Sequence, residues 1–113
     1  HNRYARGVRA GLGALGFSLF TEKPFLADTL SVVIYPPGVE DEAFRGEYYE
    51  NGVVVAGGLA ETAGRVFRMG HMGNLSSSQI YFALDAMEKS LHALGHAFEP
   101  GASIRAAKPI IGE

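Results

Sequence analysis

The sequence predicts a small α+β fold, with a three-stranded, mostly antiparallel sheet and helices packed on one face of it. Apolar residues recur at helical spacing in two stretches, residues 1–15 and 80–94. Short strand-like runs lie between them, at residues 29–35, 53–58 and 65–70. Because the connection between the last two runs is short, we expect those two strands to pair antiparallel.

The composition is that of one small domain. The chain has 113 residues, 47% of them hydrophobic, and a formal net charge of −2. It has no cysteine, which excludes disulfides and thiolate chemistry and is compatible with the cytoplasmic location that we expect. A near-neutral charge argues against nucleic acid as a partner. No apolar run approaches the roughly 20 residues that span a bilayer, so we expect no membrane partner.

The first stretch predicts an amphipathic helix that ends at Gly16. Four apolar residues share one of its faces: Tyr4, Val8, Leu12 and Leu15. The chain begins at His1, with neither a methionine nor a turn before the helix. This start is typical of a piece cut from a longer polypeptide, and an artificially altered N-terminus explains it equally well.

The middle of the chain predicts strands around a short helix. Residues 29–35 alternate and are β-branched, and the turn PPG follows them. Residues 39–51 predict a helix whose acidic first turn suits the helix dipole. Its carboxylates are expected on the solvent-exposed face: Asp41, Glu42, Glu47 and Glu50.

The clearest element is the helix that follows Ser76. Ser76 and Gln79 have the spacing of a capping box. An apolar stripe follows at spacings of four and three: Ile80, Leu84, Met87, Leu91 and Leu94. Four polar residues are expected off that stripe: Asp85, Glu88, Lys89 and His92. We expect residues 1–99 to form the domain and residues 100–113, with two prolines and two glycines, to form a tail that wraps the surface or reaches toward another partner.

Arg68 is the strongest candidate for a binding residue. In a strand, Phe67 and Met69 point to one side and Arg68 to the other. If the first two face the core, the Arg68 guanidinium lies on the opposite face and can bind a carboxylate through two parallel hydrogen bonds. An isolated strand arginine is more often exposed or paired with a nearby glutamate, and this alternative stays open at the level of residues.

Glycines surround the candidate arginine. Gly57, Gly58 and Gly70 mark places where the backbone lies against another group or turns with a positive φ, although ordinary turns explain them as well. His71 is expected to shape the turn near Arg68 and not to act as a base. The glycine pattern at residues 11–16 ends a helix and does not join a strand to one, so it does not predict a dinucleotide site.

Other titratable residues form no predicted site. His92 and His96 have the i, i+4 spacing of zinc ligands, but no cysteine or obvious third ligand accompanies them. We therefore expect surface histidines and no metal site.

The segment VVVAGGLAETAGRVFRMGHMGN, followed by a long amphipathic helix, resembles the C-terminal small domain of class V aminotransferases. These are pyridoxal-phosphate enzymes of fold type I. The subgroup that it resembles most is alanine–glyoxylate (serine–pyruvate) aminotransferase. The resemblance extends upstream through VVIYPPGVE and covers residues 1–97.

The resemblance implies a homodimeric enzyme that transfers an amino group from alanine or serine to glyoxylate or pyruvate. It implies that Arg68 holds the substrate carboxylate, and that a large domain of the same chain binds pyridoxal phosphate and supplies the lysine bonded to it. None of Lys23, Lys89 and Lys108 matches that lysine. We therefore expect these residues alone to be inactive and to bind the cofactor poorly.

Two alternatives stay open. The chain is compatible with a stand-alone α+β module that binds a carboxylate ligand or a partner protein without chemistry. It is also compatible with the small domain of another class V enzyme, such as a desulfurase or lyase, since that chemistry comes from outside this segment.

Overall fold

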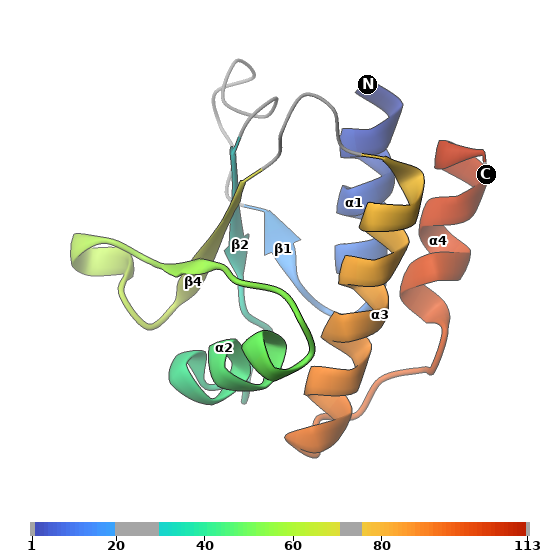
Figure 1. The fold of residues 1–113 in the computed structure, drawn as a ribbon. Helices are drawn as coiled ribbons and strands as arrows, with labels where there is room; N and C mark the ends of the chain where they lie inside the picture. The colour runs from blue at the N-terminus through green and yellow to red at the C-terminus, as the bar shows by residue number, and fades with distance from the viewer. Residues whose placement is uncertain (1, 20–29, 71–75, 113) are drawn as a thin grey trace.

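The molecule has a sheet on one side and a layer of helices on the other (Figure 1). The computed structural model describes residues 2–19, 30–70 and 76–112. The elements in chain order are α1 (Asn2–Ala14), β1 (Ser18–Leu19), β2 (Leu30–Ile34), α2 (Asp41–Glu50), β3 (Ala56–Gly57), the short 3₁₀ helix η2 (Ala60–Thr62), β4 (Val66–Gly70), α3 (Ser77–Ala93) and α4 (Ala102–Ile111). Helices α1, α3 and α4 lie side by side, and α2 packs against α3. Within the described ranges, no helix is both long and apolar enough to cross a bilayer.

The sheet confirms the predicted class and contains the three predicted strands. Its described strands are ordered β1-β2-β4-β3, and all neighbours are antiparallel, including the predicted pair β3 and β4. Two details differ from the prediction. Only Ala56–Gly57 of the run at residues 53–58 is paired, and Ser18–Leu19 adds a fourth, edge strand. A two-residue strand is too short to show an alternating pattern, so the sequence did not predict it.

One face of the sheet carries the core. Val33 on β2 lies opposite Phe67 on β4, and both side chains are fully buried. Phe67 belongs to a cluster of five aromatic rings with centroids 5.1–6.2 Å apart: Phe17, Tyr35, Phe44, Tyr48 and Phe67. The helices cover this face because their apolar stripes belong to the same core cluster.

The two predicted helical stripes are confirmed. On α1, Val8 and Leu12 are buried, and Leu15 is buried just beyond the helix. On α3, four residues of the stripe are buried and Leu94 packs against them: Ile80, Leu84, Met87 and Leu91. Gly16 follows the end of α1 with φ +95°, as predicted for a terminating glycine. The Ser76–Gln79 capping box is also present, with reciprocal hydrogen bonds.

Most of the segment that was predicted as a C-terminal tail forms helix α4. Helix α4 packs against α1, and three of its residues are buried: Ser103, Ala107 and Ile111. The close approach requires glycine on α1, since a Cβ on Gly11 would lie 2.8 Å from Leu84 Cδ1 and 3.1 Å from the carbonyl oxygen of Ser103. The domain boundary predicted between residues 99 and 100 stays a prediction.

Glu88 is buried, which corrects its predicted place among the polar residues off the core stripe. Its carboxylate accepts hydrogen bonds from the backbone N–H groups of Gly101, at 2.7 Å, and Ser103, at 3.1 Å. The Ser103 hydroxyl donates a third bond to it. These contacts satisfy N–H groups at the start of α4 that have no partner within their own helix, so Glu88 caps a helix distant in sequence.

Candidate functional site

Arg68 lies on the face of the sheet opposite the core. Its Cα partners are Val32 on β2 and Ala56 on β3. The neighbouring Phe67 is fully buried, Met69 packs against the core, and Arg68 is half-buried. The predicted alternation along this strand is therefore confirmed, because adjacent side chains of a strand point to opposite faces.

The guanidinium of Arg68 is held at one end and open at the other. Its Nε donates a 2.8 Å hydrogen bond to the carbonyl oxygen of Gly57 on the neighbouring strand. Among the described residues, no carboxylate forms an ion pair with Arg68, and its terminal nitrogens have no hydrogen-bond partner. An arginine carries five N–H donors, so four remain available to bind an anion.

Gly57 and Gly58 are glycines because of close contacts. Neither has a positive φ. A Cβ on Gly58 would lie 2.6 Å from the carbonyl oxygen of Thr62 and 2.8 Å from Val66 Cγ2. A Cβ on Gly57 would lie 3.2 Å from Nη2 of Arg45. Of the interpretations available from the sequence, close approach is thus the one that the structure shows.

The remaining predicted site residues are Gly70 and His71. Gly70 ends β4 and pairs with Leu30, two residues along the strand from Arg68. His71 lies outside the described residues. The structure therefore brings together Arg68, Gly57 and Gly58 from the predicted set.

A partly buried ion pair beside Gly57 was missed by the sequence analysis. Asp41 was expected on the exposed face of its helix, but it is only 7% exposed. Its Oδ2 lies 2.8 Å from Nη2 of Arg45, its Oδ1 accepts from Arg45 Nε at 3.1 Å, and Tyr35 donates to Oδ1 at 2.6 Å. The i, i+4 spacing of an aspartate and an arginine on a helix was the available signal.

This network keeps the ion pair charged. The hydrogen bonds from Arg45, and secondarily the one from Tyr35, lower the pKa of Asp41, although burial opposes the shift. The hydrogen bond to Asp41 raises the pKa of Arg45. Burial, assisted by the contact with Asp41, raises the pKa of Tyr35, so its hydroxyl stays protonated and donates.

A groove of about 520 Å³ runs beside this network and the glycine pair. Its lining consists of Glu40, Asp41, Glu42, Arg45, Gly57, Gly58, Ala63 and Gly64. The groove therefore joins the start of α2 to β3 and to the end of the connection before β4.

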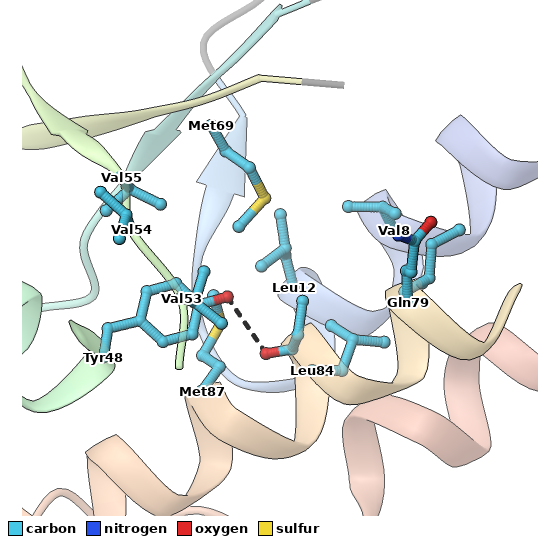
Figure 2. A pocket seen from close by; sticks show the side chains of 12 residues that line it. Val8, Leu12, Tyr48, Val53, Val54, Val55, Met69, Gln79, Leu84 and Met87 are labelled. Carbon is cyan, nitrogen blue, oxygen red and sulfur yellow. Dashed lines mark hydrogen bonds between the residues drawn. The ribbon is translucent and has the colours of Figure 1, made fainter. Parts of the chain in front are cut away.

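A second, apolar cavity of about 140 Å³ lies on the core side of the sheet (Figure 2). Val53 and Met69 line it together with residues of α1 and α3. Its tyrosine, Tyr48, already donates a 3.1 Å hydrogen bond to the carbonyl oxygen of Ala83, and burial raises the pKa of its hydroxyl. The cavity therefore offers no acid, base or nucleophile for chemistry.

The two lysines that the structure describes both lie at the surface of their helices. Lys89 is 64% exposed and pairs with Asp85 at 3.3 Å, and Lys108 is exposed on α4. Lys23 lies outside the described ranges. The part of the chain that the structure describes also contains no group of three or more side chains able to hold a metal ion.

No family model matches the chain. Comparisons with individual proteins do find relatives, and several of these are aminotransferases. The chain is 40% identical over 96 residues to an uncharacterised aminotransferase of Methanocaldococcus jannaschii, covering 84% of this chain and 25% of that protein. It is 37% identical over 109 residues to a serine–glyoxylate aminotransferase of Hyphomicrobium methylovorum, covering 95% and 27%. The structure of pyridoxamine–pyruvate aminotransferase from Mesorhizobium loti matches it with a TM-score of 0.83 and 33% identity, covering 97% and 29%.

The α+β fold of this chain matches part of solved aminotransferase structures. The chain belongs to the class V aminotransferase family and corresponds to the C-terminal portion of its members. This confirms the predicted resemblance. The chain spans about a quarter of the length of the curated relatives that it matches.

Proposed function

We propose that this chain is the substrate-binding small domain of a pyridoxal-phosphate aminotransferase that transfers an amino group from alanine or serine to glyoxylate or pyruvate. The names of the relatives support the acceptors: one is a serine–glyoxylate and another a pyridoxamine–pyruvate aminotransferase. The observation that carries the proposal is the state of Arg68. Its Nε is anchored on Gly57, while its terminal nitrogens are open among the described residues.

Arg68 binds the α-carboxylate common to these amino acids and oxo acids. Because Nε is occupied by the Gly57 carbonyl, the two parallel hydrogen bonds come from the two terminal nitrogens, in an end-on arrangement. A carboxylate held at both oxygens cannot rotate freely. Arg68 thus orients the substrate's α-carbon toward the reacting groups and lowers the entropy cost of reaction.

The remaining parts of the enzyme belong to other residues. Pyridoxal phosphate is bound mainly by a large domain of the same polypeptide, and that domain supplies the covalently bound lysine. In this proposal the assembled enzyme is a homodimer. The 113 residues alone are inactive and bind the cofactor poorly, and a spectrum of lysine-bound cofactor from this chain alone would contradict that.

The intact mass of the polypeptide encoded by the source gene is the first test. A product several times heavier than 12.1 kDa supports the aminotransferase. A native product of 12.1 kDa overturns it and favours a stand-alone binding module.

Kinetics of the full-length product test the role of Arg68. Arg68→Ala is expected to raise KM for the amino donor on the order of 100-fold, the loss of two hydrogen bonds to a charged group. Arg105→Ala is the matched control, since Arg105 is exposed and pairs with Glu99 at 2.9 Å. An unchanged KM in Arg68→Ala removes this residue from the site.

A further inference from the structure

Two arginines meet at Gly57 from opposite sides of β3. Gly57 lies opposite Phe67 in the β3–β4 register, so a side chain at this position would point to the core face. The Arg45 guanidinium occupies that space, with Nη2, Cζ and Nε at 3.2, 3.3 and 3.5 Å from the position of a Cβ. Arg68, which belongs to the other face, reaches the carbonyl oxygen of the same residue.

The Arg45 guanidinium is fixed in this place by its partners on the other side. Asp41 binds it through both carboxylate oxygens, at 2.8 and 3.1 Å. The Tyr35 hydroxyl holds Asp41 in turn, at 2.6 Å. The Asp41 side chain is 9% exposed and that of Arg45 is 33% exposed, so water is kept from the carboxylate more than from the guanidinium.

The strand that this network touches has little support of its own. β3 contains two residues and, among the strands that the structure describes, lies at the edge of the sheet and pairs only with β4. A strand this short has few ladder hydrogen bonds to hold its carbonyl groups in place. The planar Arg45 guanidinium fills the space beside Gly57 that a side chain at this position would occupy.

We infer that Arg45 is a positioning residue for carboxylate binding: held by Asp41 and Tyr35, it fixes Gly57, whose carbonyl oxygen fixes the Arg68 guanidinium. This inference rests on the proposed function of Arg68. The network also separates the roles of the two cations. Asp41 neutralises Arg45, so the substrate carboxylate binds Arg68 and not its neighbour.

The test is a set of variants of the full-length enzyme. Arg45→Met keeps the length of the side chain and removes the planar cation. It is expected to raise KM for the amino donor roughly 10-fold and to leave kcat within about twofold, because a misplaced Arg68 weakens substrate binding. Arg45→Lys keeps one ion pair with Asp41 and is expected to fall between wild type and Arg45→Met. Arg105→Met is the control and leaves KM unchanged.

The double variant of Arg45→Met and Arg68→Ala shows whether Arg45 acts through Arg68 or independently of it. If Arg45 acts through Arg68, then Arg45→Met adds less than about twofold to KM in an Arg68→Ala background. The inference is wrong if the effects of the two substitutions on KM multiply in the double variant. It is also wrong if Arg45→Met lowers only kcat. A raised KM in Arg68→Ala together with a wild-type KM in Arg45→Met overturns the inference alone. A wild-type KM in Arg68→Ala overturns the proposed function itself.

A milder variant covers the case in which Arg45→Met does not fold. Tyr35→Phe keeps the ring in the aromatic cluster and removes only the hydrogen bond to Asp41. It is expected to raise KM about two- to threefold, with no further rise in the Arg68→Ala background. A wild-type KM in Tyr35→Phe, measured when Arg45→Met is unfolded, counts against the inference.

Discussion

Arg68 and Gly57 are joined across the β3–β4 pair by a 2.8 Å hydrogen bond from Nε to the carbonyl oxygen, although the strand register places Ala56 opposite Arg68. The side chain therefore runs obliquely along the strand. The hydrogen bond limits the rotamers of a long side chain before any ligand binds, which reduces the entropy cost of binding. It also makes the position of Arg68 depend on the position of β3.

A conservative substitution at Arg68 tests whether carboxylate binding needs the planar guanidinium and its parallel hydrogen bonds. Arg68→Lys is expected to raise KM for the amino donor roughly 10-fold, because an ammonium cannot reproduce both the bond to Gly57 and two parallel bonds to a carboxylate. Steady-state kinetics of the full-length product measure this. Arg105→Lys serves as control, and a wild-type KM in Arg68→Lys shows that charge alone is sufficient.

The Asp41–Arg45 pair predicts a dependence of stability on acid pH. The folded pKa of Asp41 lies below its ordinary value of 3.8. The pair therefore contributes fully above that unfolded value, and its contribution is lost as the pH falls through the lower, folded pKa. Asp41→Asn is expected to cost on the order of 1–2 kcal/mol of unfolding free energy at neutral pH and less in acid.

Urea unfolding of the chain at a series of pH values, from about pH 7 to about pH 2, compares wild type with Asp41→Asn. Glu42→Gln, on the exposed side of the same helix, is the control. The difference between wild type and Asp41→Asn should shrink below pH 3.8, the ordinary pKa of Asp41. A constant difference across the series contradicts the assigned role of the ion pair.

Two glycine substitutions are expected to change the free energy of unfolding in opposite directions. Gly58→Ala places a Cβ 2.6 Å from the backbone oxygen of Thr62, which cannot move freely, so we expect a loss on the order of 1–3 kcal/mol. Gly46 is exposed in the interior of α2, and an added methyl group would meet nothing within 4 Å, so Gly46→Ala should stabilise by about 0.5–1 kcal/mol. Denaturant unfolding measures both, and a neutral Gly58→Ala contradicts the close contact.

The attachment of α4 depends on Glu88. Glu88→Ala leaves the N–H groups of Gly101 and Ser103 without their partner, and we expect a loss on the order of 2–3 kcal/mol. Hydrogen exchange should accelerate at the start of α4 more than in α3. Glu99→Ala is the control: Glu99 is 78% exposed, and its pair with Arg105 should contribute less than about 1 kcal/mol. Equal exchange rates in Glu88→Ala and wild type contradict this role.

The sequence by itself determined the elements whose signals are local. The apolar stripe of α3, the Ser76–Gln79 capping box and the end of α1 at Gly16 follow from spacings within a few residues. The alternation that places Arg68 away from the core is equally local, because neighbouring side chains of a strand point to opposite faces. The resemblance in residues 53–74 identified the family on the same local basis.

Only the tertiary structure decided which polar residues are buried and what they hold. Asp41 and Glu88 both lie where helical periodicity predicts exposure, yet both are buried. Asp41 is held by Tyr35, which precedes its helix, and by Arg45 of the same helix, whereas the partners of Glu88 lie at the start of α4. The contact of Arg45 with Gly57 likewise depends on how α2 packs beside β3. Burial of a charge is favourable only when partners surround it, and those partners come together only in the folded chain.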